Sequence, residues 1–189
     1  MSKGAWPAGV PLSGGPALLR PFADEDAQAR CDFYVRNRSY FREHSGIEAD
    51  KFYTPDGQRA IIRSQHADQA AGDGWYWGIF RGPGEHVIGV VSLTGIVRGP
   101  FQAAWIGYSI DEAHTGRGLA THAVQAVTAH AFRDLGLHRV EAGVMPSNAA
   151  SIRVLEKAGF AREGLMRQTV LINGRWEDHW HYAAVSDTP

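Results

Sequence analysis

The chain has 189 residues, of which 44% are hydrophobic and 21% are charged, and its formal net charge is -1. This composition is typical of a globular protein that can bury one sizeable core, and it excludes a chain that is disordered over most of its length. A net charge so close to zero gives no global basic field, so we expect no direct nucleic-acid partner.

The cysteine count and the N-terminal segment bear on location and domain organisation. Cys31 is the one cysteine and cannot form an intrachain disulfide, which fits a reducing compartment. The chain has neither a signal-peptide pattern nor an apolar run of about 20 residues, so we expect a cytoplasmic protein without a membrane partner. Residues 1–16 are rich in Gly, Pro, Ser and Ala. We therefore expect a flexible extension there and one domain over residues 17–189.

The first half of the chain changes from helical to extended spacing. Asp24 is a suitable helix N-cap, and Thr54 stands before a proline at a second helix start. Alternating apolar residues follow, and turns at Pro83-Gly84 and Gly99-Pro100 connect the resulting strands into an antiparallel meander. The predicted elements are a strand at 17–21, helices at 24–38 and 54–72, and strands at 75–80, 87–93 and 103–110.

The second half alternates helices with strands. Gly136 and Gly159 stand at positions typical of helix C-termini, and Asn173-Gly174 predicts a two-residue hairpin turn. The predicted elements are helices at 118–135 and 148–158, and strands at 138–144, 169–172 and 180–184. The whole order predicts one mixed α/β domain, α+β-like, in which helices flank a central, mostly antiparallel sheet.

The segment Thr115-Gly116-Arg117-Gly118-Leu119-Ala120 lies between a predicted strand and a predicted helix. Its glycines allow a tight turn, and the first-turn N–H groups of the helix have no internal acceptor. This combination predicts an anion site suited to a pyrophosphate, with a ligand-free turn as the alternative. Leu119 stands where a P-loop needs Lys, and Thr121 stands where a dinucleotide fingerprint needs its third glycine, so both of those sites are excluded.

These residues resemble the acetyl-CoA loop of the GCN5-related N-acetyltransferases (GNAT), Gln/Arg-x-x-Gly-x-Gly/Ala, with Thr115 in place of the usual first residue. The resemblance covers roughly residues 18–185 and includes the segments 139–144, 148–151 and 155–160. Within the family the chain is most similar to the RimJ/RimL branch of ribosomal-protein N-acetyltransferases, and more to the alanine-specific RimJ type. The segments behind this narrower likeness are 37–38, 97–101, 106–110, 138–139, 145–148 and 171–179.

The resemblance implies a GNAT-type fold and acetyl-CoA as the co-substrate. The pantetheine arm would lie along a strand that ends at Ile110 and splays from its neighbour. Main-chain groups of Tyr108 and Ile110 would bind the arm and the thioester carbonyl. The cofactor-binding loop residues would be Thr115, Gly116, Arg117, Gly118, Leu119 and Ala120.

The resemblance also implies catalytic roles for Asn148 and Ser151. Asn148 would contact the pantetheine or a bound water, with an ordinary helix N-cap as the alternative. Ser151 would stand near the sulfur, since the predicted helix contains no tyrosine, and would either protonate the departing thiolate or hydrogen-bond the sulfur while water supplies the proton. Glu141 is the candidate general base because it lies on the strand that leads into the site, but a solvent-facing side chain, a water relay and weaker candidates on the last strand remain open. Those weaker candidates are Asp178, His179 and His181.

Three functions remain open from the sequence. The leading hypothesis is an enzyme that acetylates the N-terminal amine of a protein, with a ribosomal protein as the implied target. The second is acetylation of a small amine, such as a polyamine, an amino acid or an antibiotic. The third is a CoA-binding regulatory module without turnover. We expect a monomer or a homodimer and no metal, because His114, His122 and His130 are spaced about 12 Å apart along a helix.

Overall fold

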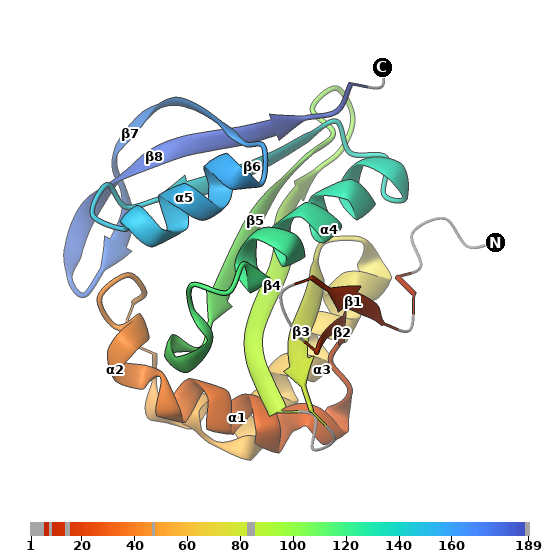
Figure 1. Ribbon diagram of the computed structural model, residues 1–189, viewed down its shortest axis with the longest axis vertical. Helices are drawn as coiled ribbons and strands as arrows, with labels where there is room; N and C mark the ends of the chain where they lie inside the picture. The colour runs from red at the N-terminus through yellow and green to blue at the C-terminus, as the bar shows by residue number, and fades with distance from the viewer. Residues whose placement is uncertain (1–5, 8, 14–15, 47, 83–85, 188–189) are drawn as a thin grey trace.

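The computed structural model describes residues 6–7, 9–13, 16–46, 48–82 and 86–187. Its centre is an eight-stranded sheet with strand order β1-β2-β3-β4-β5-β6-β8-β7 (Figure 1). The strands are β1 Val10–Leu12, β2 Ala17–Pro21, β3 Trp75–Arg81, β4 His86–Val97, β5 Ala103–Ile110, β6 Arg139–Val144, β7 Ala161–Ile172 and β8 Arg175–Val185. The α-helices are α1 Ala27–Arg36, α2 Arg38–Phe41, α3 Pro55–Ala71, α4 Leu119–Arg133 and α5 Ala149–Lys157. The predicted mixed α/β domain is confirmed.

One strand pairing differs from all the others in the described sheet. Neighbouring strands run antiparallel except β5 and β6, which are parallel and pair only over residues 103–105 and 139–141. From Ile106 onward β5 pairs only with β4, so its main-chain groups that face β6 have no strand partner. The two strands diverge toward their C-terminal ends, which confirms the expected splay of the strand that ends at Ile110.

Helices cover both faces of the sheet and create two apolar cores. α4 and α5 lie on one face, where Leu119 and Leu155 belong to the same buried cluster as Ile79 of β3 (Figure 1). α1 and α3 cover the other face, where Ile62 belongs to a cluster with Phe80. Adjacent residues of β3 thus enter opposite cores, as the alternation of a strand requires. Among the helices of the described ranges, none combines the length and apolarity needed to cross a bilayer.

The predicted start and end of α3 are confirmed, whereas the start of α1 differs. Thr54 Oγ1 accepts a hydrogen bond from the Gly57 N–H at 3.1 Å, and Gly72 ends the helix with φ 85°. Residues 24–26 form a short 3-10 turn, so α1 begins at Ala27 and Asp24 does not cap it. Both oxygens of Asp26 accept hydrogen bonds from the guanidinium of Arg20, and one also accepts from the Ala23 N–H.

Part of the expected N-terminal extension belongs to the sheet. β1 pairs with β2, with Val10 opposite Leu19, and Leu12 is buried. Trp6 donates through Nε1 to the Leu19 carbonyl at 3.3 Å, and its ring lies 4.8 Å from that of His130 in α4. For these residues the expectation of a loose segment is wrong, because strand pairing and aromatic packing hold them against the domain. Residues 1–5, 8, 14 and 15, and the predicted Pro83-Gly84 turn, lie outside the described residues.

β7 and β8 form a long hairpin at one edge of the sheet. Its turn is Asn173-Gly174, and both residues have positive φ, as the sequence predicted. The strands are much longer than the predicted segments 169–172 and 180–184. The side-chain amide of Asn173 donates to the Arg42 carbonyl at 2.7 Å, which holds the tip of the hairpin against the segment that follows α2.

β7 is the outer strand of this hairpin, and most of its residues are exposed. Its register with β8 shifts between Arg162 and Gly164 and again between Met166 and Val170. The strand therefore carries two bulges along its length.

Candidate active site

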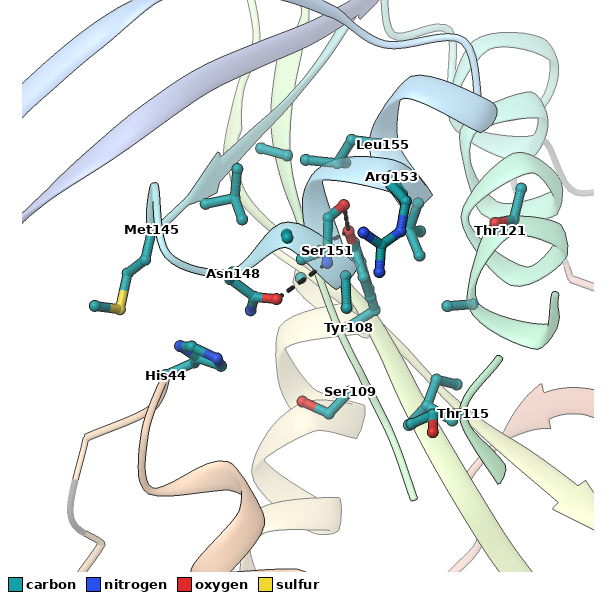
Figure 2. Close-up of a pocket in the computed structure, with 18 of the residues that line it drawn as sticks. His44, Tyr108, Ser109, Thr115, Thr121, Met145, Asn148, Ser151, Arg153 and Leu155 are labelled. Carbon is teal, nitrogen blue, oxygen red and sulfur yellow. Dashed lines mark hydrogen bonds between the residues drawn. The ribbon is translucent and has the colours of Figure 1, made fainter. Parts of the chain in front are cut away.

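A cavity of about 620 Å³ lies where β5 and β6 diverge. On the side of α4 and α5 it is lined by the segment 114–121 and by the first turns of α5. On the opposite side it is lined by Tyr40, Phe41, His44 and Ser45 near the end of α2, and by His179 of β8. Figure 2 shows His44 facing Met145 and Asn148, with Arg153 reaching in from α5. Elements from both faces of the sheet therefore share one cavity.

The loop before α4 has the geometry of an anion site. Gly116 and Gly118 have φ values of 73° and 77°, which glycine adopts without strain. Gly118 is the N-cap of α4; no side chain caps this helix start, and its first turn has no acidic residue. A Cβ at Gly116 would meet nothing within 4 Å, whereas one at Gly118 would meet His122 Cε1 at 3.3 Å. The positive end of the helix thus lies at the cavity with N–H groups available for a phosphate.

The structure brings all the predicted loop residues to this cavity, from Thr115 to Ala120. Thr115 Oγ1 donates to the Glu112 carbonyl at 2.9 Å, so this residue closes the turn before the loop. Arg117 donates through Nη2 to the Ala113 carbonyl at 3.1 Å. The side chains of Thr115 and Arg117 therefore hydrogen-bond to main-chain carbonyls just before the loop and fix its shape.

A buried carboxylate ties this loop to α1. Asp111 is 3% exposed, accepts from Asn37 Nδ2 at 3.2 Å and from the Ala113 N–H at 3.0 Å, and pairs with Arg36. Asn37 Oδ1 accepts from the Glu112 N–H at 3.0 Å. Burial alone would raise the pKa of Asp111, but the hydrogen bonds from Asn37 and Arg36 outweigh it and hold that pKa below its usual value.

Tyr108 and Ser151 form a pair of hydroxyl groups in the cavity. Tyr108 Oη lies 2.7 Å from Ser151 Oγ and 3.1 Å from the Ser151 carbonyl oxygen (Figure 2). Burial raises the pKa of Tyr108 to about 12, although the hydrogen bond with Ser151 opposes the shift. The sequence placed Tyr108 here for its main chain alone. In the structure its phenol lies beside Ser151 of α5, a helix that contains no tyrosine of its own.

Asn148 is the N-cap of α5 and also lines the cavity. Its Oδ1 accepts from the Ser151 N–H at 3.0 Å, which is the ordinary capping bond that the sequence left as an alternative. The Ser151 hydroxyl takes no part in that bond, so cap and hydroxyl pair are separate features of the same helical turn.

Two basic residues of α5 line the cavity although the sequence interpretation did not select them. Arg153 and Lys157 lie four residues apart on one side of the helix. Neither side chain has a hydrogen bond or ion pair with any residue of the described ranges. Their own spacing was the signal that could have found them, because two cationic residues four positions apart lie on one side of a helix.

Glu141 does not line the cavity. Its neighbours Val140 and Ala142 are buried in the core beneath α4 and α5, so alternation along β6 turns Glu141 to the opposite face. There Glu141 Oε1 accepts from Arg139 Nε at 2.7 Å and lies 3.1 Å from His181 Nε2. The expectation that this carboxylate faces the site is not met by the geometry.

Two imidazoles line the cavity on the side opposite the loop. His179 is 6% exposed, and its Nδ1 lies 3.2 Å from the Glu177 carbonyl oxygen. Because a carbonyl only accepts, Nδ1 carries the proton, and Nε2 of the neutral ring keeps a lone pair. His44 has a buried Nδ1 without a partner. Of the other strand candidates, His181 stacks on Trp105.

The remaining candidate, Asp178, accepts from the Gln168 N–H at 2.8 Å and does not line the cavity. Within the described part of the chain, no group of three or more His, Cys, Asp or Glu side chains is arranged to hold a metal ion.

The comparisons with known proteins agree with this architecture. Residues 17–161 match the model of the acetyltransferase (GNAT) domain. The chain is 46% identical over 168 residues to the probable N-acetyltransferase YjcK of Bacillus subtilis, covering 89% of this chain and 93% of that protein. It is 31% identical over 170 residues to the [ribosomal protein uS5]-alanine N-acetyltransferase of Escherichia coli, covering 90% and 88%.

A solved structure gives the same result. Mycobacterium smegmatis RimJ in complex with CoA-disulfide superimposes with a TM-score of 0.87 and 26% identity, covering 95% of this chain and 86% of that one. The family model and the two curated relatives each span most of the chain. The protein therefore belongs to the acetyltransferase (GNAT) domain family and is an acetyl-CoA-dependent N-acetyltransferase of the RimJ/RimL type.

Proposed function

We propose that this enzyme transfers an acetyl group to the N-terminal α-amine of a protein, with a ribosomal protein as the target. The observation that carries this proposal is the single cavity lined from both faces of the sheet. An acyl donor on the side of α4 and an extended chain end on the side of α2 would meet in the gap between β5 and β6. The likeness to an enzyme named for the alanine of ribosomal protein uS5 supports the choice of target.

The donor side fits the phosphates of acetyl-CoA. We expect the N–H groups at the start of α4 to bind the pyrophosphate, because they have no side-chain cap and the loop before them turns through two glycines. Arg153 and Lys157 add positive charge to the same cavity. When bound, acetyl-CoA supplies the acetyl group as a thioester, and the main chain around Tyr108 and Ile110, which has no partner on β6, would hold the amide-rich arm.

We expect Ser151 to donate a proton to the departing sulfur. A serine hydroxyl is a weak acid by itself, but Tyr108 Oη lies 2.7 Å from Ser151 Oγ and donates to it as negative charge shifts toward the serine. Asn148 caps the helix through Oδ1, which leaves its side-chain N–H groups available to donate to a ligand in the cavity. Its role would be to hold the ligand beside the serine.

His179 is the general base that the geometry favours. The amine must lose a proton before or as it attacks, and in the proposed arrangement the acceptor would enter from the side of the cavity that His179 lines. The hydrogen bond to the Glu177 carbonyl fixes the ring with Nε2 as the proton acceptor. Glu141 stands one strand away and is engaged by Arg139 and His181, so we do not assign it this role.

An acceptor panel tests the proposed function. Peptides that begin with Ala, the same peptides with a blocked N-terminus and an internal lysine, polyamines and free amino acids are compared by release of CoA thiol. We expect kcat/KM for the free Ala terminus to exceed that of every other acceptor by at least about 10-fold. Preference for a polyamine or an amino acid would replace the protein target with a small amine. Binding of acetyl-CoA without thiol release from any acceptor would identify a non-catalytic module.

A further inference from the structure

A second cavity, of about 660 Å³, lies among α1, α2, α3 and the segment before α3. We call it the arginine cavity, because Arg30, Arg38 and Arg42 line it and Glu48 is its one acidic lining residue. It shares Phe41, Ser45 and Ser109 with the cavity between β5 and β6. A chain that enters the active site from the α2 side therefore passes the mouth of the arginine cavity.

Arg30 is the residue that most strongly indicates a ligand in the arginine cavity. It is 4% exposed, and no carboxylate of the described residues forms an ion pair with it. Its Nη1 donates to Gln65 Oε1 at 2.9 Å, and its guanidinium lies 4.7 Å from the Phe22 ring, but Nε has no hydrogen-bond partner. A buried cation without a counter-ion is costly, and buried charges in proteins are almost always paired.

Two acidic residues near the arginine cavity are already engaged, whereas Glu48, which lines it, forms no ion pair with the described residues. Asp68 stands three residues after Gln65 on α3, and its Oδ2 accepts from Tyr76 Oη at 3.1 Å. Asp50 pairs with Arg38. Arg42 is exposed, and its guanidinium has no hydrogen bond or ion pair with the described residues. Arg30 and Arg42 thus line this cavity without an ion pair to a described residue, and Glu48 alone does not balance the three arginines.

We infer that the arginine cavity binds a carboxylate carried by the acyl acceptor. Guanidinium groups recognise carboxylates through paired, charge-assisted hydrogen bonds, which suits Arg30 and Arg42. This inference rests on the proposed function for its first source of carboxylate, an Asp or Glu side chain within the first residues of a protein N-terminus. The α-carboxylate of a small amino acid has the same chemistry and is the second source.

Matched acceptors test the inference. The acceptors are pairs of hexapeptides that begin with Ala, have no other charged side chain and differ only in carrying Glu or Gln at position 2, 3, 4 or 5. Alanine is compared with alaninamide in the same way. The ratio of kcat/KM for the acid over its amide is measured in the wild type and in the Arg30→Gln and Arg42→Gln variants. Arg63→Gln is the control, because Arg63 is a cation of α3 that pairs with Asp24 and lines neither cavity.

We expect the wild type to prefer the acid by about 10-fold at one peptide position, as charge-assisted hydrogen bonds require. The preference should fall toward unity in Arg42→Gln and Arg30→Gln and persist in Arg63→Gln. Because Arg30 is buried and its variant can fail to fold, Arg42→Gln alone is sufficient to decide. If alanine is preferred over alaninamide in a way that depends on Arg42, and no Glu peptide is preferred over its Gln partner, the site binds the carboxylate of a small acceptor.

Calorimetry without acetyl-CoA separates this inference from the proposed function. Tighter binding of a Glu peptide than its Gln partner, dependent on Arg42 and accompanied by no turnover, keeps the carboxylate site and overturns the proposed function. Turnover of peptides with equal kcat/KM and equal affinity for Glu and Gln at every position, and no discrimination between alanine and alaninamide, overturns the carboxylate site and keeps the function.

Discussion

The phenol oxygen of Tyr108 lies 2.7 Å from the hydroxyl oxygen of Ser151, which joins β5 to α5 across 43 residues of sequence. The capping bond of α5 uses the Ser151 N–H, so the Ser151 hydroxyl takes no part in capping the helix. A proton can therefore be shared between the two side chains without loosening the element that holds them.

Removing either hydroxyl should slow the chemical step. We expect Ser151→Ala to lower kcat by roughly 10-fold to 100-fold with CoA affinity nearly intact, because the interaction gains strength only as charge builds on sulfur. Tyr108→Phe should lower kcat as well, and the double variant should cost less than the product of the two. Because burial raises the pKa of Tyr108 to about 12, its hydroxyl stays protonated up to pH 10. Steady-state kinetics on the folded fraction measure this, and full kcat in Ser151→Ala would leave water as the acid.

A side chain at Gly118 should disturb cofactor binding more than folding. Gly118→Val places a branched carbon at φ 77° and 3.3 Å from His122 Cε1, next to the N–H groups that we expect to bind phosphate. We expect CoA affinity, measured by calorimetry, to fall at least about 10-fold. Gly99→Val is the matched control, since Gly99 has φ 70° in a turn outside the cavity. Equal CoA affinity in both variants would reduce the loop to a simple turn.

Arg153 should contribute to CoA affinity through its charge. We expect Arg153→Gln to raise the Kd for CoA about 5-fold to 10-fold at low salt, and the difference should shrink as salt screens the exposed charge. Arg162→Gln serves as control because Arg162 lies over the Trp180 ring, 4.5 Å from its centroid, and does not line the cavity. An Arg153→Gln variant whose Kd for CoA at low salt equals that of the wild type and of Arg162→Gln would remove Arg153 from phosphate binding.

Replacing His179 should slow the chemical step. Gln keeps a polar side chain but cannot accept a proton, so we expect His179→Gln to lower kcat/KM by about 100-fold near neutral pH. His44 lines the same cavity, so His44→Gln provides the comparison, for which we expect kcat/KM to change little. Steady-state kinetics measure both variants, and a kcat/KM that persists in His179→Gln but falls in His44→Gln would move the base to His44.

Asp111 should stabilise the protein in a pH window that its lowered pKa defines. A carboxyl with a lower pKa in the folded state stabilises that state above the unfolded value, near 3.8, and loses this effect as pH falls through the folded value. Asp111→Asn should therefore lower the free energy of unfolding by about 2 kcal/mol, evenly from pH 5 to pH 8. Urea denaturation at several pH values measures this. A loss that grows below pH 4 would contradict the assignment.

Local signals in the sequence were sufficient to predict the starts of α3 and α5 and the hairpin turn between β7 and β8. Thr54 and Asn148 cap their helices through bonds to residues three positions away, and Asn173 and Gly174 both adopt the positive φ of a two-residue hairpin turn. Such features depend on neighbours in the chain, so composition and spacing reveal them. The glycine loop before α4 is of the same kind.

Features that depend on packing between distant elements were missed. The phenol of Tyr108 meets Ser151 only because β5 and α5 meet in space, and no spacing in the sequence encodes that contact. β1 is a three-residue strand in a Gly- and Pro-rich segment, and it exists through its pairing with β2. The face of the sheet on which the Glu141 side chain lies could have been predicted from the sequence. Val140 and Ala142 are apolar neighbours on the same strand, so both face the core and the carboxylate lies on the other face.

The two bulges in β7 have a consequence for the behaviour of the enzyme at high concentration. β7 forms one of the two edges of the described sheet, and an exposed edge strand with a regular ladder of N–H and C=O groups is a template for strand pairing by another molecule. The register shifts after Arg162 and Met166 interrupt that ladder, and exposed charges at Arg162, Glu163 and Arg167 disfavour the approach of a second copy. The hairpin can therefore extend to α2 and flank the active site while its free edge resists strand-by-strand aggregation.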